Sequence, residues 1–207
     1  MEKSDLHTKL NPSANVSQLV AVLNYFHPLG EGVEQFLVKH AYSCSFRKNA
    51  LLLKTGDVCE HVYFIIKGAV RGFIKEGQKD ITTWITAENE LVTSISGLDK
   101  KDPAMENIQA IEDCELLALK YSDVQDLYEQ FPEFNIVIRK LLQKYYSDAE
   151  GRAFIARLHS AESKYKYFLA HHSHLVNRIP LKYVASFLGI TLETLSRVRK
   201  RISTTKL

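Results

Sequence analysis

Between Tyr42 and Lys120 the chain repeats short apolar or alternating runs, each closed by a glycine or by a cluster of polar residues. Strands of about five or six residues at spacings of roughly ten are typical of an antiparallel β-roll or barrel. Gly56, Gly68 and Gly77 stand where tight reversals need a positive φ. We expect strands over Ala50–Lys54, Val62–Lys67, Val70–Lys75, Ile81–Thr86, Asn107–Glu112 and Glu115–Lys120.

Helical patterns flank this region on both sides, so the expected fold class is α+β with a jelly-roll-like sheet domain. The first dozen or so residues are polar and indicate a loose lead-in. Short helices are expected over Val16–Phe26, Gly32–Lys39, Ser122–Phe131 and Ala161–Ala170.

A long helix is expected from Glu133 to about His159, on the order of 40 Å at 1.5 Å per residue. One side of it carries residues at intervals of three and four, namely Phe134, Val137, Ile138, Leu141, Tyr145, Asp148, Arg152 and Ile155. A helix of this kind commonly packs against a copy of itself. The alternative is that the stripe covers the β-roll. Gly151 costs roughly 1 kcal/mol relative to alanine inside a helix and marks a candidate hinge.

The composition is that of a globular protein, with 45% hydrophobic and 25% charged residues among 207. No apolar run reaches the roughly 18–20 residues of a membrane span, and the N-terminus lacks a signal pattern, so a soluble cytoplasmic protein is expected. Cys44, Cys59 and Cys114 are odd in number and widely separated, which indicates small apolar residues rather than disulfides or metal ligands.

Three histidines, His171, His172 and His174, form a polar bend after the helix over Ala161–Ala170. Such a bend admits a metal site, but no cysteine or carboxylate stands beside it. A solvated loop is the expectation, with no metal.

Leu181 to Lys200 has the pattern of two helices crossing at a tight turn. A small residue is needed where the helices touch, and a residue that tolerates left-handed φ is needed in the turn. Ala185 supplies the first and Gly189 the second. The apolar wedge between the helices consists of Val184, Leu188, Ile190, Leu195 and Val198. The pattern predicts a helix-turn-helix; an ordinary helical hairpin with a basic face is the alternative.

The second of these helices has the features of a DNA-reading element. Thr191 stands at the N-cap and Glu193 in the first turn, where the helix dipole favours an acid. Glu193, Ser196, Arg197 and Lys200 lie away from the apolar side, and arginine can bind guanine O6 and N7 with two hydrogen bonds. Candidate phosphate ligands are Lys182, Arg199, Lys200 and Arg201.

Charge is distributed unevenly along the chain. From Arg178 to Leu207 there are seven Lys and Arg residues against one acid, which gives +6, whereas the whole chain is +3. A basic C-terminal segment on a slightly acidic body suggests a polyanionic partner.

These features together resemble the Crp/Fnr superfamily of bacterial transcription regulators. The run Thr191–Arg197 is similar to the Glu-x-x-Ser-Arg recognition helix of the Fnr-like branch, which implies that Glu193, Ser196 and Arg197 read a TTGA-type half-site of an inverted repeat. Gly56-Asp57, Tyr63-Phe64-Ile65 with Gly68, and Glu88-Asn89-Glu90 resemble the β-roll of the cyclic-nucleotide-binding fold.

The resemblance implies an effector pocket in the roll, with Glu90, Phe64 and Gln109 as candidate residues. Asn89 replaces the glycine of the phosphate cassette, and Ala104-Met105 stands at the usual Arg-Ser position, with no arginine between Arg71 and Arg139. Lys100 and Lys101 are poor replacements for a bidentate arginine. We therefore expect an effector other than cAMP. The N-terminal cysteines of an Fnr iron–sulfur cluster are missing, the histidines leave haem open, and the cofactor is unknown.

The resemblance also implies three units: a sensor over residues 1–120, a dimerisation unit over 121–159 and a helix-turn-helix unit over 160–207. Its implied partners are double-stranded DNA, a second copy of the chain, RNA polymerase and an unidentified small molecule, without a membrane. The alternative is a ligand-binding module that regulates a protein partner. A non-enzyme is expected, because the sequence lacks a nucleophile elbow, a phosphate-cradling glycine loop and the His-x-His spacing of a cupin.

Overall fold

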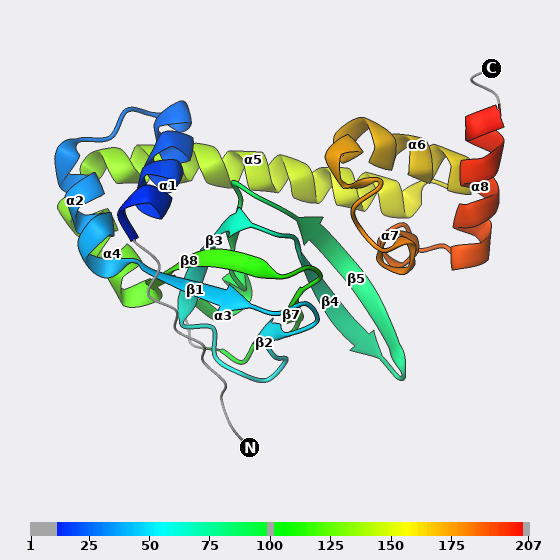
Figure 1. Ribbon diagram of the computed structural model, residues 1–207, viewed down its shortest axis with the longest axis horizontal. Coiled ribbons are helices and arrows are strands. Elements are labelled where there is room, and N and C mark those ends of the chain that lie inside the picture. The colour runs from blue at the N-terminus through cyan, green and yellow to red at the C-terminus, as the bar shows by residue number, and fades with distance from the viewer. Residues whose placement is uncertain (1–11, 99–101, 205–207) are drawn as a thin grey trace.

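The computed structural model of the protein describes residues 12–98 and 102–204. Two four-stranded antiparallel sheets form the roll, in the orders β1-β8-β3-β6 and β2-β7-β4-β5. The strands are β1 (Tyr42–Phe46), β2 (Leu51–Leu53), β3 (His61–Lys67), β4 (Val70–Glu76), β5 (Lys79–Thr86), β6 (Leu91–Val92), β7 (Asn107–Ala110) and β8 (Cys114–Lys120). The roll lies beneath one long helix (Figure 1).

All six predicted strands are present, and the α+β fold class is confirmed. β7 ends at Ala110 rather than at residue 112. Glu112 belongs to the turn into β8, and its carboxylate accepts a hydrogen bond from Arg178. Two strands were missed by sequence reasoning. β1 lacks a strong apolar alternation although it pairs with β8 along its whole length, and β6 has only two residues.

Helices α1 (Pro12–Phe26), α2 (Glu31–His40) and α4 (Tyr121–Gln130) gather at one end of the molecule, around the first half of α5 (Pro132–Arg157) (Figure 1). Their apolar faces share a core with β3 and β8, to which Leu23, Leu37, Phe64, Leu117 and Leu127 contribute. α1 begins at Pro12, earlier than the expected Val16. The short helix α3 (Ile95–Leu98) follows β6.

The apolar residues of the predicted α5 stripe pack against the same chain. Phe134, Val137 and Leu141 are buried, the first two in the core beneath α1, and Ile155 is buried in the core around α6 to α8. The apolar part of the stripe thus covers the interior of its own chain, as the alternative interpretation expects, whereas Asp148 in the same stripe is exposed. A second, exposed stripe of α5 remains.

Gly151 lies where α6 (Ala161–His171) crosses α5. A Cβ at this position would stand 2.5 Å from the hydroxyl oxygen of Tyr167, so the glycine permits a close approach of the two helices. α5 is continuous through Gly151.

The C-terminal part contains α6, the 3₁₀ turn η1 (Ser173–Leu175), α7 (Leu181–Phe187) and α8 (Leu192–Thr204), and it lies at the end of α5 farthest from α1 and α2 (Figure 1). Its core includes Ala69, Ile85, Ala87 and Ile111 from the roll. The C-terminal helices are thus packed onto the roll of their own chain.

The histidine bend is only partly solvated. His171 and His174 are exposed, whereas His172 is half-buried and stacks near Phe168 and Phe187. No cluster of three metal-ligating side chains occurs within residues 12–98 and 102–204. Cys59 and Cys114 are buried and Cys44 is half-buried, and no disulfide joins the three. Among the described helices, none combines the length and the apolarity that crossing a bilayer requires.

Candidate nucleic-acid interface and ligand groove

The turn between α7 and α8 has the geometry that its residues predicted. Gly189 has φ +62°, and the N–H of Ile190 donates to the carbonyl of Ala185, closing the end of α7. This six-to-one bond with a left-handed glycine is a common helix C-terminus, and an L side chain at Gly189 would be strained. Ala185 is buried at the crossing, beside Leu195 and Val198 of α8.

Thr191 caps α8. Its Oγ1 accepts a hydrogen bond of 3.1 Å from the N–H of Thr194, one of the helix-terminal donors without an intrahelical partner. The cap determines where the helix begins, and therefore which side chains point away from the roll. Leu195 and Val198 are buried, which turns the opposite side of α8 outward.

Three predicted reading residues lie together on this outward side. Glu193, Ser196 and Arg197 are exposed on the first two turns of α8, and Lys200 follows one turn later. The side chains of Glu193 and Arg197 form an ion pair across one helical turn while remaining 72% and 77% exposed. Their hydrogen-bonding groups can therefore exchange solvent for base edges at a small desolvation cost.

The predicted phosphate ligands differ in their surroundings. Lys182 is exposed at the start of α7 and lies over the ring of Tyr183, and Arg199 is partly buried. Arg201 is held by Glu162 of α6, so this guanidinium serves the packing of α6 on α8. Lys182, Lys200 and Arg201 are the exposed cations of the set, and Arg201 is paired with Glu162.

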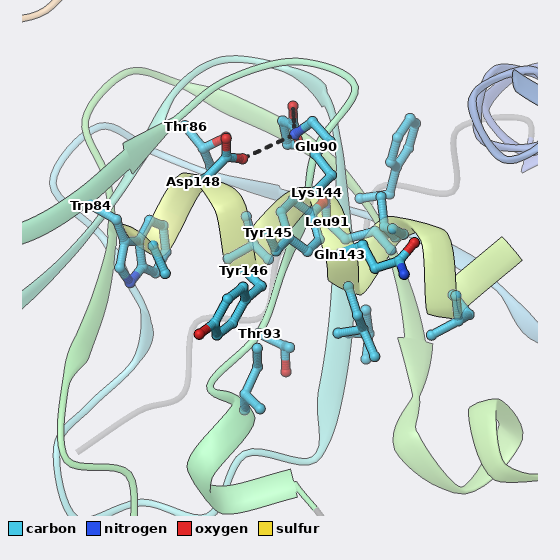
Figure 2. Close-up of a pocket in the computed structure, with 18 of the residues that line it drawn as sticks. Trp84, Thr86, Glu90, Leu91, Thr93, Gln143, Lys144, Tyr145, Tyr146 and Asp148 are labelled. Atoms are coloured by element: carbon cyan, nitrogen blue, oxygen red, sulfur yellow. Dashed lines mark hydrogen bonds and ion pairs between the residues drawn. The ribbon is translucent and has the colours of Figure 1, made fainter. Parts of the chain in front are cut away.

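A large open groove of about 1960 Å³ runs along α5 between the helix and the roll. Its walls are mostly apolar and aromatic. Figure 2 shows Trp84, Leu91 and Thr93 of the roll together with Lys144, Tyr145 and Tyr146 of α5 among the residues that line it. A concave apolar site with few polar groups is the usual form of a small-molecule pocket.

Two polar contacts join the walls of this groove. The ammonium of Lys144 lies 2.8 Å from the nearer carboxylate oxygen of Glu90, with Asp148 at 3.4 Å (Figure 2). The N–H of Leu91 donates to the hydroxyl oxygen of Tyr145 at 2.9 Å. Burial raises the pKa of the Tyr145 phenol, which keeps it neutral. The contacts fasten the roll to the middle of α5.

Trp84, the single tryptophan of the chain, closes the roll beside the groove. Its Nε1–H donates to Glu106 at 2.9 Å. Burial raises the pKa of the Glu106 carboxyl, while the bonds from Trp84 and Thr83 oppose that shift. A carboxyl therefore lies directly behind the indole.

The candidate effector residues do not all reach the groove. Glu90 and Phe64 line it, Phe64 as a buried part of the wall. Gln109 lies elsewhere, on β7, where its side chain accepts from Arg71 and donates to the carbonyl of Asn49. Lys100 and Lys101 lie outside the described residues.

Comparison with known proteins agrees with this architecture. Residues 43–131 match the model of the cyclic nucleotide-binding domain. A global nitrogen regulator of Nostoc sp. is 27% identical over 125 residues, covering 59% of this chain and 54% of the relative. The transcriptional activator protein Anr of Pseudomonas protegens is 22% identical over 173 residues, covering 78% and 70%. This chain thus spans about half the length of the nitrogen regulator.

Solved structures show the same fold. FixK2 from Bradyrhizobium japonicum superposes with a TM-score of 0.71 at 18% identity, covering 80% of this chain and 86% of that one. A CooA mutant from Carboxydothermus hydrogenoformans gives 0.69 at 20% identity, covering 90% and 84%. The chain therefore shares the fold of these proteins, and its residues 43–131 are similar to the cyclic nucleotide-binding domain. The predicted resemblance is confirmed for the roll and for the order of roll, long helix and C-terminal helices.

Residues 102–106, the described part of the loop before β7, contain no cation, whereas Lys144 and Arg152 of α5 line the groove. Ala104 is buried and Met105 is exposed at the position where the superfamily resemblance implies an Arg-Ser pair. A buried phosphate without a cationic or backbone partner is costly. Arg71, the nearest arginine earlier in the sequence, is bound to Asp80 and Gln109.

Trp84, Lys144 and Tyr145 line the groove, but the sequence did not predict them as groove residues. Tyr145 was assigned only to the helical stripe. These aromatic and cationic residues indicate a ligand site only once the position of α5 over the roll is known. Arg178 was counted only as a basic charge of the C-terminal segment, although it binds two carboxylates of the roll.

Proposed function

We propose that this protein is a sequence-specific DNA-binding transcription regulator that acts as a homodimer. The observation that carries the proposal is the exposed side of α8, where Glu193, Ser196 and Arg197 occupy the first two turns of a capped helix after a helix-turn-helix turn. The N-terminal residues of such a helix contact base edges in the major groove. Lys182 and Lys200 lie exposed nearby and are proposed to bind phosphates, with Arg199 in a minor part.

The proposed dimer uses the exposed stripe of α5. Leu142, Tyr146, Ala149, Ala153 and Ala156 recur at alternating intervals of four and three residues, and all are exposed in the single chain. Leu142 is 50% and Tyr146 is 70% exposed, which is unusual for large apolar side chains on a helix that is otherwise packed. This spacing is that of a two-stranded coiled coil. A dimer would present two copies of α8 to an inverted repeat.

For the groove, we propose a small-molecule effector that is not a cyclic nucleotide. The support is the apolar and aromatic lining, the pairing of Lys144 with Glu90, and the replacement of the phosphate-binding pair by Ala104 and Met105. A ligand that binds one conformation better than another shifts the orientation of the two reading helices.

Within this proposal, residues 1–120 form the sensor, 121–159 the dimerisation unit and 160–207 the DNA-binding unit. The sensor and the DNA-binding unit share a hydrophobic core. The boundary between them therefore separates proposed roles and not two independently packed domains. We further propose that the protein works in the cytoplasm, where promoter DNA and RNA polymerase are present.

The test is selection of bound duplexes from a random pool by the purified protein. The expected product is an inverted repeat with TTGA-type half-sites, bound with an affinity that falls linearly in log–log plots against salt concentration. A selected pool without any repeat, together with salt-independent binding, would reject the proposal in favour of a ligand-binding module that regulates a protein partner.

A further inference from the structure

Residues 85–92, which we call the β5–β6 segment, contribute to all three hydrophobic cores of the molecule. Ile85 and Ala87 pack with α6, α7 and α8, whereas Leu91 packs against the core beneath α1 and Val92 lies in the interior of the roll. Protein interiors are close-packed and transmit strain. A shift of this segment therefore reaches the roll, α5 and the DNA-reading helices together.

An ion pair between Glu88 and Arg178 joins the β5–β6 segment to the DNA-binding unit, residues 160–207. The two carboxylate oxygens of Glu88 lie 2.6 and 2.7 Å from Nη2 and Nη1 of Arg178, in the connection before α7. Arg178 also donates to Glu112 of the β7–β8 turn at 2.7 and 2.9 Å. The N–H of Gly68 donates to Glu88 at 2.7 Å and fixes its carboxylate. Bidentate pairs of this type are strong and geometrically specific.

Two residues further along, the same segment holds α5 at the ligand groove. Glu90 binds Lys144, and the N–H of Leu91 donates to Tyr145. The groove is lined at this point by Glu88, Glu90 and Leu91, and farther along by Leu175 and Phe187 of the DNA-binding unit. A ligand in the groove thus touches the segment and both of the parts that it connects.

The link between Glu88 and Glu90 is rigid. Asn89 between them has a left-handed φ of +68°, and its N–H donates to the carbonyl of Ile65. The N–H of Ile65 in turn donates to the carbonyl of Glu90. These two bonds fix the backbone between Glu88 and Glu90 to strand β3, so a displacement of the backbone at one residue reaches the other.

Beyond Arg178, the roll also holds α7 directly. The hydroxyl of Ser186 donates to the carbonyl of Asp80 and accepts from the N–H of Thr82 on β5. The guanidinium of Arg71 lies 4.1 Å from the ring centroids of both Phe73 and Tyr183. α7 therefore has a defined seat on the β4–β5 hairpin, which a shift of the β5–β6 segment would alter.

We propose that the β5–β6 segment couples the ligand groove to the DNA-reading helices, with Glu90 and Leu91 as its contacts to the groove and Glu88 with Arg178 as its contact to α7 and α8. The inference rests on the proposed function for the role of α8 in DNA binding, but the coupling itself is a property of one chain. Removal of the Glu90–Lys144 pair should therefore loosen α7, to which neither residue is bonded.

The first test is amide hydrogen exchange in full-length Glu90→Gln and Lys144→Gln variants. Both should raise the exchange rates of the α7 amides several-fold, and by more than those of α4, which meets the segment only through the core that contains Leu91. Lys144→Gln removes the pair from the other side, so the result does not depend on one variant that fails to fold. Asp113→Asn, beside Glu112 but bound to Arg47, is the matched charge control and should leave α7 unchanged.

Non-additivity provides the second measurement. Arg178→Gln alone should raise α7 exchange, and adding Glu90→Gln should then have little further effect, because the connection is already cut. Unchanged α7 exchange in Glu90→Gln and Lys144→Gln would overturn the coupling. So would full additivity with Arg178→Gln.

DNA affinity separates this inference from the proposed function. With the selected duplex, Glu90→Gln should change Kd several-fold in the wild-type background and leave it unchanged in the Arg178→Gln background. Equal Kd changes in both backgrounds would overturn the coupling. If the wild-type protein binds no duplex while exchange in α7 still responds to Glu90→Gln, the coupling stands and the proposed function fails.

Discussion

Trp84 lies directly against Gly72 on the neighbouring strand, where a Cβ on the glycine would stand 2.2 Å from two atoms of the indole. The two residues are opposite each other in the β4–β5 ladder, and the indole is anchored by Glu106. The absence of a side chain at position 72 is thus what allows the tryptophan to lie flat beside the groove.

Gly72→Ala should destabilise the fold by about 1–3 kcal/mol, because the added methyl group must push the indole off Glu106. Urea unfolding followed by circular dichroism measures the loss, and the emission of the single tryptophan reports its changed environment. Gly77→Asn is the control, since a Cβ there meets no atom within 4 Å and asparagine tolerates the left-handed φ. Equal stability of Gly72→Ala and the wild type would contradict the packing described.

Arg197→Ala should weaken binding to the selected duplex by about ten- to a hundred-fold, as expected for one bidentate contact to guanine worth ~1–3 kcal/mol. The half-site preference should relax at one base pair. Titration by fluorescence anisotropy measures the affinity, and circular dichroism checks the fold.

Arg47→Ala is the matched control for that titration. It removes the same charge from an exposed ion pair on the roll and should leave binding unchanged. Equal losses in the two variants would point to a general charge effect and against base reading by α8.

Tyr146→Glu should convert the proposed dimer into a monomer, because two carboxylates would face each other across the α5 seam. Sedimentation velocity measures the mass of the particle. Ser147→Glu places the same charge on the neighbouring exposed position, outside the seam, and should remain dimeric. A dimer that persists in Tyr146→Glu would move the interface away from this stripe.

Stability should decline between pH 6.5 and pH 4 because of His172. Burial beside Phe168 and Phe187, reinforced by His174 and His171, lowers the pKa of His172 from 6.5 to about 4. In this range the unfolded chain binds the proton and the folded chain does not, so acidification favours unfolding by up to ~3 kcal/mol. Above pH 6.5 the contribution is constant.

Urea unfolding at several pH values measures that slope. His172→Phe keeps an aromatic ring in the cluster and should flatten the slope between pH 6.5 and 4. His159→Gln, which changes an exposed histidine, should keep it. Below about pH 4 a further loss is expected from Glu88, since the Arg178 hydrogen bonds lower the pKa of its carboxyl to about 2.

The helix-turn-helix could be predicted from the sequence because its determinants are local. The cap at Thr191, the left-handed Gly189 and the buried Ala185 stand within seven residues of one another, so their spacing alone specifies the turn. The strands of the roll were predictable for the same reason, from short runs and turn residues.

The groove and the ion pair between Glu88 and Arg178 could not be predicted in this way. Glu88 and Arg178 are 90 residues apart, and no periodicity links them. Gln109 was placed in the pocket by analogy, but its side chain bonds to Arg71 and to the carbonyl of Asn49 instead. On a strand, the face on which a side chain lies depends on a register that only the assembled sheet defines.

The two halves of the exposed α5 stripe differ in size, with Leu142 and Tyr146 toward the sensor and Ala149, Ala153 and Ala156 toward the DNA-reading end. Helix axes approach according to the side chains between them. In a dimer the pair of helices would therefore taper, held apart by the large residues and closing over the alanines. A small change in the crossing angle of the two α5 helices would then change the spacing between the two α8 helices, because the pair would pivot about the alanine contact.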